Sequence, residues 1–319
     1  MSARELDRAG VSDRDLRLAY EECRRLNARH GRTYFLATRL LSPAQRPAVH
    51  ALYGFARWAD DIVDDPGVPG GLTARAAALD ELERRFGTAW QDGRGGHPVV
   101  DAVVDTARRY GIGRRHFTDF LASMRMDLHV EEYPTFQELM TYVHGSAAVI
   151  GLQCLPVLRT VGPQERAAPH AAGLGTAFQI TNFIRDVGED LDRGRIYLPA
   201  DQLASHGVDR DLLMWCRRTG RGSARVAAAL RERIAHTRGL YRYASLGVPI
   251  LAPASRPCVA AALVLYRRIL DEVERHGVEV VLHRRVCVSR GRRAAVAARG
   301  AAGAAVARFG AAAARRGGR

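Results

Sequence analysis

GLGTAFQITNFIRDVGEDLDRGRIYLP occupies residues 173–199 of a chain of 319 residues and constrains its fold more than any other stretch. The spacing of its apolar residues predicts a helix. At 100° per residue, its polar side chains share a stripe about 80° wide, formed by Gln179, Asn182, Asp186 and Asp190. A polar stripe on so apolar a helix is costly unless it faces a polar cavity or polar partners. The stretch therefore predicts a buried helix with an acidic face turned toward a cavity.

A second acidic cluster, ALYGFARWADDIVDD, occupies residues 51–65. On a helix, Asp60 and Asp64 lie one turn apart, on a stripe shared with Tyr53 and Arg57. Two carboxylates at positions i and i+4 repel each other unless a cation lies between them. Magnesium, a hard cation that takes oxygen ligands, fills that role. A solvated acidic helix end is the alternative, and this cluster taken alone suits it equally well.

Together, the two predicted acidic helices could form one metal site. Facing each other across a helical bundle, they would surround a cavity with four carboxylates and the Asn182 amide. Two or three Mg²⁺ ions, or Mn²⁺ in their place, would clamp diphosphate oxygens there and neutralise pyrophosphate as it leaves. Arg185 lies off the stripe, but its side chain is long enough to reach an adjacent phosphate. The remaining cavity has to be apolar, to hold a prenyl tail and keep water from an allylic cation.

Helical spacing covers most of the chain. Ten stretches have apolar residues at helical intervals: 15–29, 43–64, 73–90, 98–110, 115–128, 135–160, 164–191, 209–217, 222–244 and 254–276. Alternating β patterns are nearly absent, and the best strand candidate, 278–288, is weak. We therefore expect an all-α, single-domain bundle over residues 1–290. An Ala/Gly/Arg-rich basic tail, expected to be disordered, follows over 291–319.

The formal charge of +14 lies mostly at the C-terminal end, where ten arginines and no acidic residue follow Glu279. The body offers no basic helix interleaved with aromatics, so no nucleic-acid partner is expected. The tail is either solvated or in peripheral contact with an anionic membrane surface. Five scattered cysteines argue against a disulfide framework and a thiolate zinc site. With a polar N-terminus and no apolar run near ~18 residues, the sequence predicts a cytoplasmic protein, at most peripheral at a membrane.

From about Tyr20 to Arg290 the chain resembles the squalene/phytoene synthase family. The segments that carry the resemblance are RHGRTYFLATRLL (29–41), YGFARWADDIVDD (53–65), TYVHGSAAVIG (141–151), QITNFIRDVGEDLDRGRIYLP (179–199) and LVLYRRILDEVE (263–274). The third segment departs from the family pattern, with Ser146-Ala147-Ala148 in place of V-A-G. The resemblance implies an isoprenoid-synthase-like helical bundle with a central apolar cavity.

The resemblance also implies roles for individual residues. Metal ligands are implied at Asp60, Asp64, Asn182, Asp186 and Asp190. Contacts to substrate or diphosphate are implied at His30, Gly31, Arg32, Thr33, Tyr53, Arg57, Gln179, Arg185 and Tyr266. Catalytic roles are implied for Tyr142, close to the reacting carbons, and for Arg57 and Arg185. A core tyrosine with a satisfied hydroxyl is an alternative interpretation of Tyr142, and His144 nearby is interpreted as structural rather than as a base.

The family's chemistry joins two prenyl diphosphates head to head through a cyclopropylcarbinyl diphosphate. For this chain the resemblance favours phytoene formation from two geranylgeranyl diphosphates, without NADPH. The chain also shows no G-x-G-x-x-G after a strand, so it has no dinucleotide fold of its own. Two alternatives remain open. One is synthesis of squalene, dehydrosqualene or hydroxysqualene from two farnesyl diphosphates, and the other is a helical scaffold of the same fold without catalytic activity.

Overall fold

The computed structural model describes residues 3–64 and 69–317, without the side chains of Arg32 and of residues 308–317. The described residues are helical and contain no strand beyond two isolated bridges. The helices are α1 (Ala3–Arg8), α2 (Arg14–His30), α3 (Arg32–Thr38), α4 (Arg46–Asp64), α5 (Gly71–Asp92), α6 (Pro98–Tyr110), α7 (Arg114–Met126), α8 (Phe136–Val143), α9 (Val149–Leu158), α10 (Ala168–Asp192), α11 (Ala200–Ser205), α12 (Arg210–Thr219), α13 (Ala224–Ser245), α14 (Arg256–Arg275) and α15 (Arg290–Gly317). The prediction of an all-α chain is confirmed.

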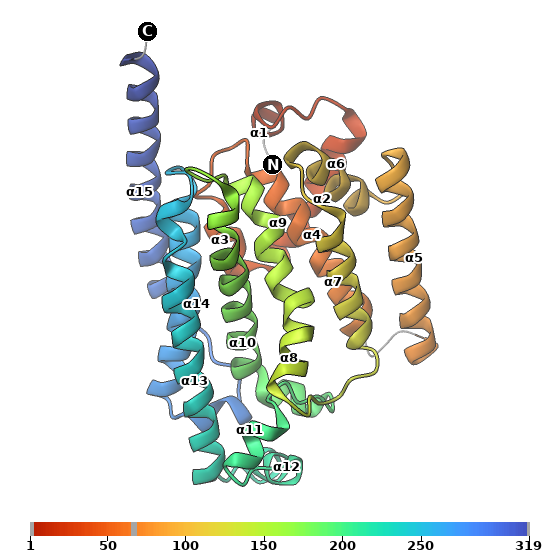
Figure 1. The fold of residues 1–319 in the computed structure, drawn as a ribbon, viewed down its shortest axis with the longest axis vertical. Helices are drawn as coiled ribbons and strands as arrows, with labels where there is room; N and C mark the ends of the chain where they lie inside the picture. The colour runs from red at the N-terminus through yellow and green to blue at the C-terminus, as the bar shows by residue number, and fades with distance from the viewer. Residues whose placement is uncertain (1–2, 65–68, 318–319) are drawn as a thin grey trace.

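Two central helices organise the bundle. α4 packs against α2 and α6, and α10 packs against α9, α13 and α14. α10 runs through the middle of the molecule in Figure 1, with α13 and α14 on one side of it and the N-terminal helices on the other. One large apolar cluster lies among α2 and α4 to α7, and a second among α10 to α14. The helices that carry the two acidic clusters are therefore each anchored in a core of their own.

Small residues allow the helices around α10 to pack almost backbone to backbone. α8 and α9 form one continuous helix joined by a π-helical turn, His144–Ala148. A Cβ atom on Gly151 would lie 2.2 Å from the carbonyl oxygen of Ala171, and one on Gly175 would lie 2.2 Å from that of Ala147. Ala147 and Ala148 are buried at this contact. The small residues that replace the family's V-A-G therefore still permit close packing of this helix against α10.

The continuous helix Phe136–Leu158 has the length and composition to cross a membrane, which differs from the expectation drawn from apolar runs. Half of its most apolar window is buried inside the protein. It packs against α7 and α10. Burial of this kind is typical of a core helix.

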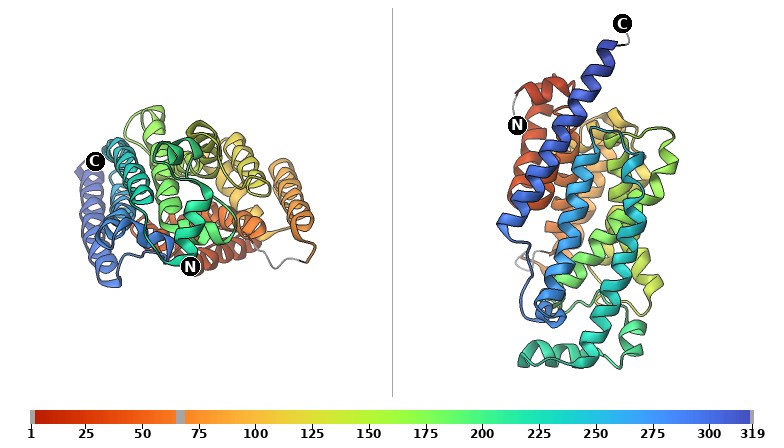
Figure 2. Two further views of the ribbon diagram at one scale, coloured as in Figure 1. Left: turned by 90° about the horizontal axis from the view of Figure 1, so that it is seen from below. Right: turned by 90° about the vertical axis from the view of Figure 1, so that its left-hand side faces the viewer.

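The C-terminal segment differs from the expected disordered tail, because it forms the helix α15. The helix lies alongside α14, as the side view in Figure 2 shows. Val296 and Ala304 are 9% and 3% exposed, and Gly300 leaves room for Leu40. Arg292 also pairs with Glu272 of α14. High alanine content favours a helix, and small side chains permit close docking that does not need large apolar groups. The domain boundary near residue 290 stays a prediction.

Candidate functional site

The acidic faces of α4 and α10 border one polar cavity of about 470 Å³. Its walls carry Arg57, Asp61, Asp64, Asp186, Glu189, Asp190, Arg193 and Arg285. Three of the five predicted metal ligands, Asp64, Asp186 and Asp190, are therefore brought together from helices more than 100 residues apart. Their role as ligands stays a prediction. The expected apolar chamber also stays a prediction, because this cavity is lined by charged side chains.

Two arginines hold the α10 side of the cavity. Arg185 donates to both carboxylate oxygens of Asp186, with Nε–Oδ1 at 2.8 Å and Nη2–Oδ2 at 2.6 Å. Arg285, from the segment after α14, reaches the same carboxylate, with its Nε 3.0 Å from Oδ1. The Asp186 side chain is only 16% exposed. A bidentate pair at this depth fixes the position of the carboxylate.

The α4 side is held by arginines that follow α10. Arg195 donates from Nη1 to Oδ1 of Asp64 at 2.8 Å, and Arg193 lies 3.5 Å from Oδ2. Arg57 pairs with Asp61 one turn away on α4. The end of α10 and the segment after it therefore hold a carboxylate of α4 across the cavity.

Two aspartates lack such hydrogen bonds among the described residues, and burial changes their protonation. Burial, with the charge of Asp64, raises the pKa of Asp60 to about 8. Burial, with the charge of Asp186, likewise raises the pKa of Asp190 to about 8. The nearby arginines lower both pKa values but do not offset burial. Each acidic helix thus carries one predicted ligand held by arginines and one that retains its proton at neutral pH.

The donor set fits Mg²⁺. The Oδ1 atom of Asn182 is buried without a hydrogen-bond partner, while its Nδ2 donates to Gln179 at 3.3 Å. An unpaired amide oxygen one turn from Asp186 and two turns from Asp190 matches the oxygen ligands that Mg²⁺ takes. Among the described residues, however, no three acidic, histidine or cysteine side chains converge on one point. Arginines hold two of the carboxylates instead, as expected for a site in which cations compete for the same oxygens.

Tyr142 lies outside the acidic cavity but is linked to it. Its buried hydroxyl donates to Oδ2 of Asp127 at 2.7 Å, and Tyr197 donates to Oδ1 at 2.8 Å. The backbone oxygen of Asp127 accepts from Arg195, the residue that holds Asp64. Burial raises the pKa of Asp127 to about 6, although the two tyrosine hydroxyls oppose this shift. The hydroxyl of Tyr142 therefore has a hydrogen-bond partner, as expected for a core tyrosine. That partner, Asp127, is linked through Arg195 to Asp64, a predicted metal ligand.

The predicted substrate residues divide into two groups. Gly31 packs against Tyr53, since a Cβ on Gly31 would lie 2.7 Å from its ring. Tyr266 stacks on Phe178, with ring centroids 4.2 Å apart, and Tyr34 lies 5.4 Å from Tyr266. Tyr34 is also 6.0 Å from Tyr53, so these four rings form one aromatic wall.

The remaining predicted residues do not join this wall. His30 is exposed and does not line the cavity, and Thr33 is half-buried. The side chain of Arg32 lies outside the described residues. His144 is mostly exposed, 3.9 Å from Asp119.

Sequence reasoning missed several charged residues of the site. Arg193 and Arg195 directly follow the second acidic cluster, so their proximity to it was a usable signal. Asp127 lies outside both acidic clusters singled out in the sequence. Arg285 is 99 residues from Asp186 in the chain, and nothing in the local sequence indicates that the two meet.

Comparison with known proteins decides the family. The family model described as squalene/phytoene synthase matches residues 27–292. A phytoene synthase of Arthrospira platensis is 37% identical over 278 residues, covering 82% of this chain and 86% of the relative. The chain belongs to the squalene/phytoene synthase family. This family is one of enzymes, and the resemblance seen in the motifs is confirmed.

Other matches agree with this placement. A chloroplastic phytoene synthase of Zea mays is 38% identical over 271 residues, covering 82% of this squalene/phytoene synthase and 61% of the relative. The chain thus spans about three fifths of that longer protein. A crystal structure of a dehydrosqualene synthase superposes with a TM-score of 0.78 at 23% identity, covering 89% of this chain and 96% of the other. That likeness confirms the isoprenoid-synthase-like fold.

Proposed function

We propose that this protein is a phytoene synthase, which condenses two geranylgeranyl diphosphates head to head through a cyclopropylcarbinyl diphosphate and releases diphosphate. The observation that carries the proposal is the convergence of the two acidic helices on one cavity ringed by arginines. The identity to phytoene synthases over four fifths of the chain supports the choice of substrate. A scaffold without activity would not need two buried aspartates on facing helices whose pKa values are raised to about 8.

The carboxylates and the free amide oxygen would hold the metal ions. The ligands are Asp60, Asp64, Asn182, Asp186 and Asp190. Bound Mg²⁺ supplies electrostatic stabilisation of the departing diphosphate. Asp60 and Asp190 lose their protons when they ligate, because a nearby cation favours the charged carboxylate. No reductant is required by this reaction, so NADPH is not proposed as a cofactor.

The arginines of the cavity would bind the diphosphates. Arg57, Arg193 and Arg285 line the cavity. Arg193 and Arg285 are paired with Asp64 and Asp186, whose oxygens the ions would take over, and Arg57 is paired with Asp61. Released from these carboxylates, the guanidinium groups can donate to phosphate oxygens, for which their forked geometry is suited. Arg185 lies deeper and continues to orient Asp186.

Tyr142 and Asp127 are suited to take up the proton lost when the last carbocation becomes an alkene. The Tyr142 oxygen would accept the substrate proton while its own proton passes to Oδ2 of Asp127, 2.7 Å away. The pair then carries one added proton, and the negative charge of Asp127 is neutralised. A carboxyl with a pKa of about 6 can accept that proton and release it again near neutral pH.

Product analysis tests this proposal. The full chain is incubated with Mg²⁺ and either geranylgeranyl or farnesyl diphosphate, with and without NADPH, and the hydrocarbons are identified by mass spectrometry. We expect a forty-carbon product from geranylgeranyl diphosphate that is independent of NADPH. A thirty-carbon product alone would overturn the phytoene assignment but keep the family chemistry. Absence of any hydrocarbon, from folded protein with Mg²⁺, would favour the scaffold.

A further inference from the structure

Outside the acidic cavity, one buried arginine has no ion-pair partner among the described residues. Arg233 belongs to α13 and is 6% exposed. Its guanidinium covers the ring of Phe136, at 5.1 Å from the centroid, and its Nη1 atom is buried without a hydrogen-bond partner. Among the described residues no carboxylate forms an ion pair with it. The aromatic face solvates only one side of the cation.

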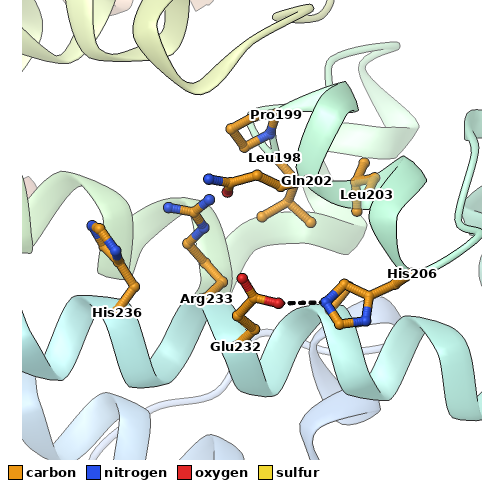
Figure 3. Close-up of a pocket in the computed structure, with 9 residues that line it drawn as sticks. Leu198, Pro199, Gln202, Leu203, His206, Glu232, Arg233 and His236 are labelled. Atoms are coloured by element: carbon orange, nitrogen blue, oxygen red, sulfur yellow. Dashed lines mark hydrogen bonds and ion pairs between the residues drawn. The ribbon is translucent and has the colours of Figure 1, made fainter.

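Nearby acidic residues are engaged elsewhere. Glu232 pairs with His206, whose Nε2 lies 2.5 Å from its Oε2. Asp201 accepts from the backbone of Gln202 at 2.7 Å. Figure 3 shows Glu232 turned toward His206, while Arg233 rises from the same helix toward Gln202.

The other deeply buried arginines are not left in this state. The side chain of Arg185 is 14% exposed and has a bidentate carboxylate, and that of Arg195 is 13% exposed and has Asp64. Burying a charge without a counter-charge is strongly unfavourable. Burial also lowers the pKa of Arg233, and the charges of Glu232 and Asp201 oppose this shift only in part. The fold therefore provides the cationic half of an ion pair at Arg233 and leaves the anionic half open.

Arg233 lines a small pocket between α11 and α13. The pocket is half-open, has an enclosed volume of about 30 Å³ and is also lined by Gln202, His236 and Glu232, whose carboxylate is turned to His206. The enclosed part admits one or two oxygen atoms of an oxyanion, the rest of which would extend through the open side, and it excludes a prenyl chain. A guanidinium, an imidazole and an amide are donors for a compact oxyanion. We propose that Arg233, His236 and Gln202 form a second binding site, which takes a small phosphate-type oxyanion.

The proposed anion site is separate from the acidic cavity, because the two share no lining residue. Two of its lining residues nevertheless follow Tyr197 directly in the sequence. Leu198 and Pro199 form part of its wall and directly follow Tyr197, which donates to Asp127. The anion is either orthophosphate or diphosphate, and diphosphate would also be the product of the proposed reaction. Binding at this site does not depend on that reaction.

Thermal unfolding with inorganic phosphate tests the site in the full chain. Wild type, Arg233→Met and Arg231→Met are compared in metal-free, chelated buffer with NaCl holding the ionic strength constant. Arg231 is an exposed arginine two residues earlier on the same helix. Phosphate bound in the acidic cavity contributes equally to all three proteins, so the difference between them isolates Arg233.

We expect phosphate to raise the melting temperature of wild type and Arg231→Met, and to raise that of Arg233→Met much less. Without phosphate, Arg233→Met should melt at or above wild type, since methionine removes the unpaired charge and keeps contact with Phe136. The apparent affinity lost in Arg233→Met should be about tenfold or more. An equal response of all three proteins to phosphate would overturn the proposal.

Histidine NMR gives a local measurement that needs no Arg233 variant. Resonances of labelled histidine are followed in wild type, and His236 is assigned with His236→Gln. Phosphate or diphosphate bound beside His236 should raise its pKa, because an anion favours the protonated imidazole. Tighter binding of diphosphate would identify the product as the ligand, and equal or tighter binding of phosphate would identify orthophosphate. If neither anion moves His236, the site is refuted.

Discussion

The two acidic helices differ in how their carboxylates are held. On α10, Asp186 is 16% exposed and is clamped by its neighbour Arg185 and by Arg285. On α4, Asp64 is 38% exposed and is held by Arg193 and Arg195, which come from the far side of the cavity. The α10 carboxylate is thus positioned mainly by its own helix, and the α4 carboxylate by the segment that directly follows α10. The site is complete only when the bundle brings both helices together.

The largest effect is expected when either acidic face loses a carboxylate. We expect Asp60→Asn and Asp186→Asn each to lower turnover by about two to three orders of magnitude, because each removes a charged ligand from the proposed metal cluster. Steady-state turnover with saturating Mg²⁺ measures this loss, and far-UV circular dichroism checks that the helices remain. Asp192→Asn is the matched control.

Asp192 lies at the end of α10, where its exposed side chain pairs with Arg217 outside the cavity. Its replacement should leave turnover near the wild-type value. Near-normal turnover in Asp60→Asn alone would remove Asp60 from the proposed ligands and leave α4 with Asp64 only.

A smaller effect is expected from replacement of Asp127, which contacts Arg195, the arginine that holds Asp64 of α4. Asp127→Asn should lower turnover by about 10–100-fold, because an amide cannot accept the hydroxyl protons of both Tyr142 and Tyr197. The contact from Arg195 is to the backbone oxygen of Asp127, so it survives the substitution. The loss should therefore appear in the maximal rate, with the Mg²⁺ requirement unchanged.

Tyr197→Phe serves as the comparison for Asp127→Asn. It removes one hydroxyl but leaves the pair of Tyr142 and Asp127 intact, so we expect only a several-fold loss. A loss as large as that of Asp127→Asn would show that the Tyr197 hydroxyl, and not only the pair of Tyr142 and Asp127, is needed for turnover.

The two protonated aspartates make the stability of the metal-free protein depend on pH. The folded-state pKa values of Asp60 and Asp190 are about 8, above the ordinary value of 3.8. Between these values the folded protein binds more protons than the unfolded chain. Stability therefore falls as pH rises through this window, by up to about 1.4 kcal/mol per pH unit for each group.

Urea unfolding at pH 5.5 and 7.5 with a chelator measures this slope, which is the sum over all titrating groups. Asp190→Asn should be less sensitive to pH than wild type over the same interval, and Asp60→Asn should match it if the two helices are equivalent. Added Mg²⁺ should reduce the slope of wild type. A variant as pH-sensitive as wild type would mean that its aspartate is already ionised at pH 5.5.

The sequence was sufficient to predict the long helices. It was insufficient to predict the contacts between segments that lie far apart in the chain. The polar stripes on 51–65 and 173–199 brought Asp64, Asp186 and Asp190 to one cavity because helical geometry is local, whereas Asp60 and Asn182 are not among the residues that line it. Short helices such as α3 and α11 were missed, since they have too few turns to show a period. Arg285 and Asp127 were missed because their positions depend on tertiary packing. The docking of α15 was not expected, because close contacts of alanine and glycine leave no apolar pattern in the sequence.

The smallest effect on turnover is expected from deletion of the C-terminal helix α15, which does not line the acidic cavity. Deletion of residues 291–319 removes the contacts of Val296 and Ala304 with the bundle and the pair of Arg292 with Glu272. The free energy of unfolding should fall by about 1–2 kcal/mol, in proportion to the apolar area exposed. Turnover should stay within about twofold of wild type, because a change confined to the distant α14 surface is additive with the site rather than coupled to it. A folded truncation without turnover would show instead that α15, through α14 and Tyr266, positions the aromatic wall beside both acidic helices.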